Sequence, residues 1–294
     1  MSYNPTPESR RVLSRGWYWT QSVAYAVTAR WVFYRLLQDS IYGGKGGYKH
    51  LLGLLSKARK EFYEGWRPWT LADDSRAPVL MQREGHYTIY LRGSGFESEK
   101  KWLNTLKEEL NCPLDRWANQ PVYAEAWFEA AAMQSQFLYY ANPNLPLLAF
   151  HGDISIPEKW RAARRIADAW EKYHHPIEIF YYGDYDPKGL MIPDSAWRDI
   201  QLWSYSIIAQ KGREAAKEFH ENLNFTRVGI NEDQIEELDL PENPERPGTY
   251  QWEALNDDQA EQLIALANEN LDMGAFEEVE GQEGDIATRL KTRL

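Results

Sequence analysis

The sequence contains a single cysteine, Cys112, and no long run of apolar residues. One cysteine cannot form an intrachain disulfide or a zinc site built from several thiolates. No stretch approaches the roughly 18 consecutive apolar residues of a membrane span, and the opening stretch MSYNPTPESRR is too polar for a signal peptide. We therefore expect a cytoplasmic protein with no membrane partner.

An overall excess of positive charge is also missing, because the formal net charge is −11. Phosphate backbones are bound mainly through Lys and Arg, so this value at first disfavours a nucleic-acid partner. The charge is unevenly spread, however: residues 1–120 contain 18 Lys and Arg against 12 Asp and Glu, and the remainder contains 15 against 32. A basic front half predicts contact with a polyanion, and an acidic back half predicts solvated surface and metal ligands.

The length of 294 residues favours two domains. Apolar residues recur at helical spacing over residues 21–39 and again over 48–64, and short strand-like pieces follow at 68–76 and 86–95. Two basic helices followed by a β-ribbon predict a winged helix-turn-helix domain over residues 1–118. Residues 111–120 are the candidate linker to the next domain.

After this linker the sequence alternates between strand and helix patterns. Strands are predicted at 121–129, 145–150 and 177–186, and helices at 130–140 and 156–173. Strictly alternating strands and helices predict an α/β domain, in which a parallel sheet is covered by helices, over residues 119–294.

Carboxylates follow two of these predicted strands. Asp184 and Asp186 come directly after the apolar run IEIFYY, and Glu129 ends an earlier strand, with Glu125 four residues before it as a reserve ligand. Residues two apart on a strand face the same side, and the carboxyl ends of parallel strands meet at one sheet edge. An all-oxygen set suits Mg²⁺. An Asx turn with helix-capping carboxylates would produce the same pattern without a metal.

The spacing of Glu129 and GDYDPKG resembles the Toprim domain of topoisomerases, primases and related nucleases. The form GDxDPxG behind a basic winged-helix segment is similar to the A subunit of type IIB topoisomerases (topoisomerase VI) and its meiotic double-strand-break relatives. The stretches FHGDISIPEKWRAARRIA and TYQWEALNDDQAEQLI are further matches. The resemblance implies a Toprim-like Rossmannoid sheet with a C-terminal helical extension, Mg²⁺ held by Glu129, Asp184 and Asp186, double-stranded DNA as substrate, and a homodimer.

The same family carries an arginine and a nucleophilic tyrosine in its winged helix, and RWVFY at residues 30–34 is similar to that segment. The resemblance places Tyr34 at the nucleophile position and implies Mg²⁺-dependent DNA transesterification. Arg30, one helical turn earlier, could lower the pKa of the phenol and bind the scissile phosphate. From the residues alone, the favoured interpretation is that Tyr34 is a packed aromatic on an amphipathic helix.

Two features depart from the family pattern. Ala130 stands where the family has a lysine after its glutamate, and the short GGKGG stretch at 43–47 is not a P-loop, so strand passage would require a separate ATPase subunit. Lys188 is expected to be exposed to solvent. Two other functions fit the sequence: a Toprim nuclease that cuts with water, and a non-catalytic winged-helix DNA-binding protein of plasmid or phage type.

Overall fold

The computed structural model describes residues 3–44, 46–67, 70–72, 97–110, 112–150, 154 and 156–293. The chain folds into two compact units. One comprises Met1–Ser75 and Val122–Asn270, and the other comprises Arg76–Pro121 and Leu271–Leu294. The N-terminal helices therefore belong to the same unit as the sheet. No described helix is long and apolar enough to cross a membrane.

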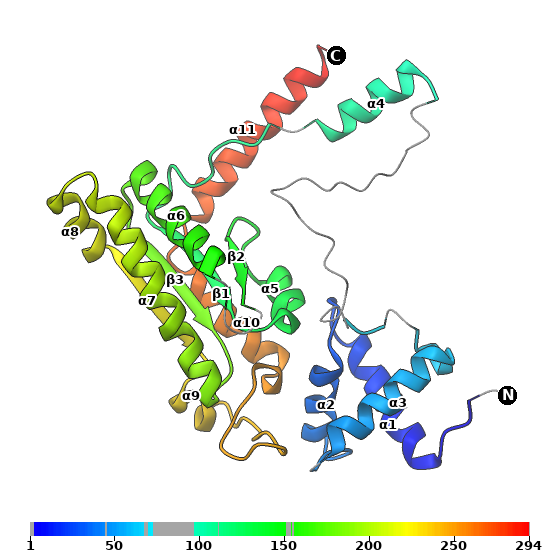
Figure 1. Cartoon of the computed structure of the whole chain (residues 1–294). Coiled ribbons are helices and arrows are strands. Elements are labelled where there is room, and N and C mark those ends of the chain that lie inside the picture. The colour runs from blue at the N-terminus through cyan, green and yellow to red at the C-terminus, as the bar shows by residue number, and fades with distance from the viewer. Residues whose placement is uncertain are drawn as a thin grey trace. The chain divides into compact units, whose positions relative to one another are not determined.

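The sheet of the larger unit has four parallel strands in the order β2, β1, β3, β4, which confirms the predicted α/β class (Figure 1). Phe128 of β1 is in register with Tyr182 of β3, so these neighbouring strands end at the same level. The loops that follow both strands therefore start side by side at one sheet edge. The strand bounds are Tyr123–Phe128 for β1, Leu147–Ala149 for β2, Ile177–Tyr182 for β3 and Leu223–Gly229 for β4.

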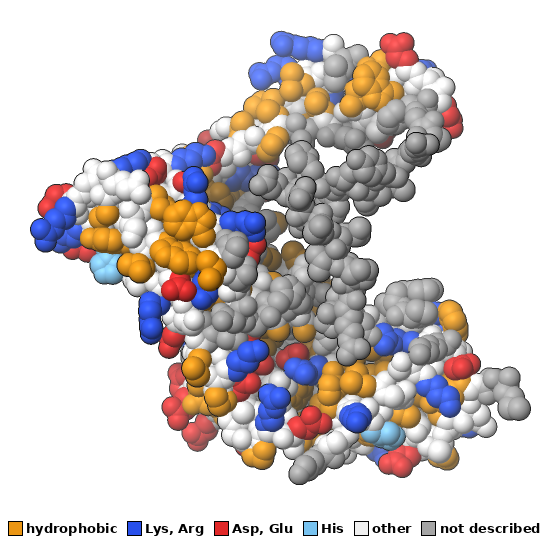
Figure 2. Space-filling model, in the orientation of Figure 1, with side chains coloured by type: hydrophobic (Ala, Val, Ile, Leu, Met, Phe, Trp, Pro, Cys, Tyr) orange, Lys and Arg blue, Asp and Glu red, His pale blue; other side chains and the backbone are white. Residues whose placement is uncertain are grey.

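Helices cover this sheet, and α6 lies beside α7 across it (Figure 1). The helix predicted over residues 156–173 is confirmed with those bounds. Figure 2 shows hydrophobic side chains over these two helices, where Trp160 packs edge to face against Trp203. The bounds are α5 Gln134–Tyr140, α6 Ile156–Tyr173, α7 Pro187–Ala209, α8 Arg213–Glu221, α9 Glu232–Glu237 and α10 Asp257–Ala265, with short 3₁₀ turns at Ala131–Met133, Trp252–Ala254 and Leu266–Asn268.

Aromatic residues fill both sides of the sheet. Tyr181 stacks on Phe225, whereas its neighbour Tyr182 packs edge to face against Phe137 and Trp252. Consecutive residues of a strand point to opposite faces, so a strand that is buried on both sides carries large apolar groups at every position. This explains why IEIFYY reads as a continuous apolar run rather than as an alternating one.

Three helices in the N-terminal region form their own apolar core around Leu13, Val32, Leu51 and Trp66. They are α1 Pro7–Gln21, α2 Ala29–Gln38 and α3 Gly47–Lys60, followed by a 3₁₀ turn at Tyr63–Gly65.

The single helix expected over residues 21–39 is wrong, because α1 ends at Gln21 and α2 begins only at Ala29. Thr28 sets this second start, since its side chain accepts a hydrogen bond of 3.1 Å from the backbone N–H of Trp31 and so caps the new helix. The predicted β-ribbon falls mostly on residues 73–96, outside the described residues. The winged helix therefore stays a prediction.

The smaller unit contains α4 Glu99–Glu109 and α11 Met273–Lys291. The candidate linker packs on α11, where Trp117 meets Phe276 edge to face and Arg116 pairs with Glu283 and Glu280. Gln120 donates to the carbonyl of Asp272 and accepts from its N–H, both at 2.9 Å. Residues 112–120 are thus attached to the C-terminal helix.

Glu125, expected as a reserve metal ligand, is fully buried in β1. Its carboxylate accepts hydrogen bonds from Tyr123 at 2.9 Å, from Trp127 at 2.7 Å, and from two guanidinium nitrogens of Arg165 at 2.7 Å each. Each oxygen already has two donors, so neither is available to an ion. The expectation is wrong, because the carboxylate serves to anchor α6 to the sheet.

Replacing Arg165 by alanine should destabilise the protein by about 2–4 kcal/mol, because it leaves a buried carboxylate with two neutral donors only. Arg161→Ala is the matched control on the same helix, since Arg161 pairs with Glu158 at the exposed surface and should change stability by less than about 0.5 kcal/mol. Urea unfolding measures both. Similar losses in the two variants would contradict the anchoring role of Glu125.

Candidate functional site

The structure brings Glu129 and Asp184 together at the carboxyl edge of the sheet. The backbone N–H of Glu129 donates to the carbonyl of Tyr182 at 2.9 Å, which continues the pairing of β1 with β3 by one residue. The Glu129 side chain then turns toward the neighbouring loop, where its Oε2 accepts a hydrogen bond of 3.1 Å from the N–H of Asp184. The parallel register places these two acids as the sequence predicts.

Two glycines allow this carboxylate to lie against the backbone of the GDYDPKG turn. A Cβ atom at Gly189 would lie 2.7 Å from Oε2 of Glu129 and would clash with the carbonyl of Asp184. A Cβ at Gly183 would lie 3.0 Å from the same carboxylate oxygen. The glycines of this motif are therefore required for close approach.

Asp186 has a structural role at the start of α7. Its Oδ1 accepts a hydrogen bond of 2.6 Å from the N–H of Gly189, and Pro187 occupies the first helical turn, where its missing N–H costs nothing. The helix-capping alternative is thus confirmed for Asp186. Capping engages one carboxylate oxygen in this bond, so the residue keeps a second oxygen for a ligand. Lys188 is exposed, as expected.

Arg227, a residue that the sequence analysis did not single out, holds the backbone of the turn in place. Its guanidinium donates to the backbone carbonyls of Asp184 at 2.7 Å, Gly189 at 3.0 Å and Gly183 at 3.1 Å. Burial lowers the pKa of Arg227. The available signal was an arginine inside the strand LNFTRVG, at a position where a sheet covered on both faces would carry an apolar residue.

Negative charge is concentrated at this edge of the sheet. Burial raises the pKa of Glu129, and the nearby Asp186 adds to that rise. The pKa of Asp184 lies well above its ordinary value because the carboxyl is buried and because Glu253 and Glu129 repel its charge. A divalent cation bound here would reduce the repulsion between these carboxylates, and their oxygens are the ligands that such a cation prefers.

Glu253 is a fourth acid at this site. Its side chain is only 7% exposed, and it follows directly on two residues that touch the site. Sequence reasoning matched the stretch TYQWEALN but assigned no role to this glutamate. Glu253 is close to the turn because of the path that residues 251–253 take along the sheet edge, and a local sequence pattern does not predict that path.

Residues 251–253 join the acidic turn to helix α2. Gln251 Oε1 accepts a hydrogen bond of 2.8 Å from the phenol of Tyr34, and the N–H of Trp252 donates to Asp184 Oδ1 at 2.8 Å. The carbonyl of Glu253 accepts from the guanidinium of Arg35 at 3.1 Å. Three consecutive residues therefore connect the predicted nucleophile to a predicted metal ligand within one compact unit.

Arg35 and Gln38 extend this attachment. Arg35 is 2% exposed and also donates to the carbonyl of Leu255, and Gln38 donates to the carbonyl of Ala254 at 2.8 Å. Burial without a direct carboxylate partner lowers the pKa of Arg35 to about 10. Arg35 and Gln38 of α2 thus donate to the three successive carbonyls of residues 253–255 and attach this backbone to the helix.

Tyr34 is 1% exposed, and the pKa of its phenol is raised. Burial is the main cause and the negative charges of Glu253 and Asp184 contribute, while Arg30 acts in the opposite direction. We expected the guanidinium to lower the pKa of the phenol. That expectation is wrong in its net direction, because desolvation and the carboxylates outweigh one cation.

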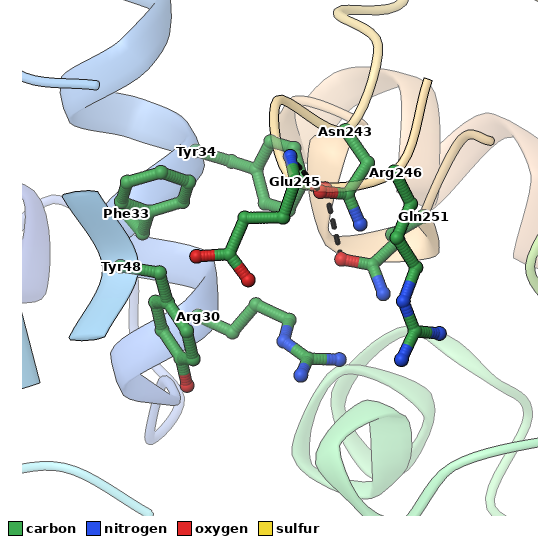
Figure 3. Close-up of a pocket in the computed structure, with 8 residues that line it drawn as sticks. All are labelled: Arg30, Phe33, Tyr34, Tyr48, Asn243, Glu245, Arg246 and Gln251. Atoms are coloured by element: carbon green, nitrogen blue, oxygen red, sulfur yellow. Dashed lines mark hydrogen bonds between the residues drawn. The ribbon is translucent and has the colours of Figure 1, made fainter. Parts of the chain in front are cut away.

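A pocket of about 120 Å³ opens beside Tyr34 (Figure 3). One wall comes from α2 and α3 and the other from the loop before the Trp252 turn. Side chains with hydrogen-bonding or charged groups dominate its lining. The lining residues are Arg30, Phe33, Tyr34, Tyr48, Asn243, Glu245, Arg246 and Gln251.

Among the described residues, no three acidic, histidine or cysteine side chains converge closely enough to form a ready metal cage. Mg²⁺ commonly uses only one or two protein carboxylates and keeps several waters, so the acids present fit that ion. Comparisons with protein-family models, curated proteins and solved structures give no match to this chain. Functional inference therefore depends on the geometry of the site.

Asp184→Asn should stabilise the protein by about 1–2 kcal/mol at pH 7.5 without divalent cations. The folded-state pKa of Asp184 is raised, so ionisation weakens the fold as pH increases through that value. Below about pH 4 the carboxyl is neutral in both states, and the advantage of the amide should disappear. Asn keeps the oxygen that accepts from Trp252.

Thermal unfolding in EDTA at pH 4 and pH 7.5 measures this difference. Asp168→Asn, at an exposed position of α6, is the control and should change little at either pH. A lower melting temperature for Asp184→Asn at pH 7.5 would contradict the inference that the ionised Asp184 carboxylate destabilises the folded protein.

Proposed function

We propose that the protein is a Mg²⁺-dependent enzyme that cleaves DNA strands by transesterification, with Tyr34 as the nucleophile. The observation that supports this most is the Gln251–Glu253 segment, which contacts the phenol of Tyr34 on one side and Asp184 on the other. This arrangement supports a site that combines the proposed nucleophile with the proposed Mg²⁺ ligands. The basic charge of residues 1–120 supports a polyanionic substrate.

In the proposed reaction Arg30 holds the non-bridging oxygens of the scissile phosphate. The Tyr34 oxygen forms a bond to phosphorus while the bond from phosphorus to the sugar 3′ oxygen breaks. The phenol proton passes to Glu253, the carboxylate whose charge acts most strongly on the phenol and which is not one of the proposed Mg²⁺ ligands. Gln251 holds the phenol in position through its 2.8 Å hydrogen bond.

Glu129, Asp184 and Asp186 would hold Mg²⁺, one or two of them directly and the rest through waters on the ion, with Glu253 beside them as a fourth acid. When bound, the ion would supply stabilisation of the charge that develops on the leaving oxygen. Tyr34 is linked to Asp184 of its own chain through Gln251 and Trp252, so the proposed site needs no residue from a second subunit. A homodimer and a separate ATPase subunit are proposed only for strand passage.

A hydrolytic nuclease is the second candidate, and one observation favours it. Tyr34 is almost fully buried and its pKa is raised, which also describes a phenol that serves the core. In that case the acids would act on water, and Tyr34 would only hold Gln251. The two candidates share the metal site and differ in whether DNA becomes attached to protein.

Tyr34→Phe tests the choice between them. The change removes one oxygen, so it should cost about 1 kcal/mol of stability, because Gln251 loses its donor. DNA binding should persist, whereas Mg²⁺-dependent nicking of supercoiled DNA and covalent capture on a denaturing gel should disappear. Tyr140→Phe is the matched control, since it removes a phenol that donates to Asp257 outside this pocket.

Nicking that persists in a folded Tyr34→Phe protein would exclude transesterification and leave the nuclease. An absence of nicking in the unaltered protein as well would instead favour a non-catalytic DNA-binding role. Thermal melting shows in each case that the variant is folded.

Mg²⁺ binding is tested without any activity measurement. Asp186→Asn should weaken the calorimetric Mg²⁺ signal at least tenfold while leaving the melting temperature of the metal-free protein nearly unchanged, because asparagine also caps helices well. Glu129→Gln should lose the signal too. Asp168→Asn should titrate like the unaltered protein, and identical curves for all three variants would remove the metal site.

A further inference from the structure

Two arginines reach into the pocket beside Tyr34 from different elements (Figure 3). Arg30 projects from α2, with its guanidinium carbon 5.4 Å from the centre of the Tyr48 ring. Arg246 projects from the loop that forms the opposite wall. Within the described residues neither arginine forms an ion pair, although Glu245 lines the same pocket. The two guanidinium groups share this space with the carboxylate of Glu245, which is not in an ion pair with either of them.

The amide side chains of the pocket add donors rather than acceptors. The Oδ1 atom of Asn243 accepts from the N–H of Glu245 at 3.0 Å, and the Oε1 atom of Gln251 accepts from Tyr34 at 2.8 Å. Both carbonyl oxygens are therefore engaged, and each amide presents its NH₂ group as a further donor. Two guanidinium groups and two amide NH₂ groups together are suited to a tetrahedral oxyanion.

The loop that carries Arg246 is held by its own hydrogen bonds. The backbone N–H of Arg246 donates to the carbonyl of Asn243 at 3.1 Å. The carbonyl of Arg246 accepts from the N–H of Thr249 at 3.2 Å and from the hydroxyl of Thr249 at 2.7 Å. Asn243 is 9% exposed and anchors the start of this turn. The position of Arg246 is thus set by the fold of the loop.

The same loop is fastened to the acidic turn. Tyr250 and Tyr185 exchange two backbone hydrogen bonds of 2.8 and 2.9 Å, so the end of the loop pairs with a residue between Asp184 and Asp186. An anion held by Arg246 and Arg30 would therefore lie at a fixed place relative to the acids. A phosphate that reacts with a nucleophile next to a metal ion must be held at a fixed position relative to both.

We propose that residues 243–251 form a phosphate clamp, in which Arg246 and Arg30 together bind one phosphate group. The identity of the phosphate as part of a DNA backbone rests on the proposed function, whereas the anion specificity rests on the pocket alone. Arg246 binds and positions the phosphate and takes no part in bond making.

Arg246→Ala tests the clamp in the full-length protein. Anisotropy of a fluorescein-labelled 20-base-pair duplex in EDTA should show about five- to tenfold weaker binding at low salt, and the slope of log affinity against log salt should fall by about one. Arg246→Lys should recover the slope. Arg213→Ala is the matched control at an exposed position of α8 outside the pocket, and it should retain the affinity and slope of the unaltered protein.

A second arm uses inorganic phosphate as the probe. Phosphate at the ionic strength of a sodium chloride reference should raise the melting temperature of the unaltered protein and of Arg213→Ala more than that of Arg246→Ala, which should show only the general salting effect. An equal rise in all three proteins would overturn the clamp. A selective phosphate effect with unchanged DNA binding would overturn the DNA backbone as the source.

Tyr34→Phe separates this proposal from the proposed chemistry. That variant keeps both arginines, so adding Arg246→Ala to it should weaken duplex binding by the same factor as in the unaltered protein. Persistent cleavage by the Tyr34→Phe protein, with the Arg246 effect on duplex binding intact, would therefore count against the nucleophile alone. Loss of cleavage in Tyr34→Phe, with no effect of Arg246→Ala on duplex binding, would count against the clamp alone.

Discussion

The contact between the Glu129 carboxylate and the backbone of the GDYDPKG turn is the constraint on which the rest of the site depends. It requires β1 and β3 to be parallel neighbours that end at the same level, and it requires glycine at the two positions where a Cβ would strike the carboxylate. Arg227 compensates for the crowding by donating to the carbonyls of the turn. Burial of these acids raises their pKa values, so their ionised forms destabilise the fold, and a bound cation would offset that destabilisation.

Much of the sheet is predictable because its signals are local. The apolar run IEIFYY and the amphipathic stretch from Ile156 to Tyr173 each encode one element, and alternation of such elements implies parallel strands. The juxtaposition of Glu129 with Asp184 also follows, since parallel strands bring their carboxyl ends to one edge. In these cases the periodicity of a short segment determines both the element and the direction of its side chains.

Other features depend on contacts between distant segments and leave little trace in local sequence. The break before Ala29 is decided by one capping threonine inside an otherwise helical pattern. Glu125 has the same spacing and chemistry as a metal ligand, yet Arg165 on α6 occupies it. The direction of the Tyr34 pKa shift could not be inferred from Arg30 alone, because Glu253 is far away in the chain and the burial of the phenol is a tertiary property. The pocket loop with Arg246 lies in a stretch that reads as solvated acidic surface.

The attachment of residues 253–255 to α2 fixes the rotation of that helix about its own axis. Arg35 and Gln38 donate to successive carbonyls while Tyr34 donates to Gln251, so the segment is bonded to the helix at three positions within about one turn. One residue corresponds to about 100° of helical rotation, and a one-residue insertion or deletion upstream within α2 would therefore present a different face to the acids. The phase of this helix, more than its length or its position along the axis, determines which side chain meets the sheet edge.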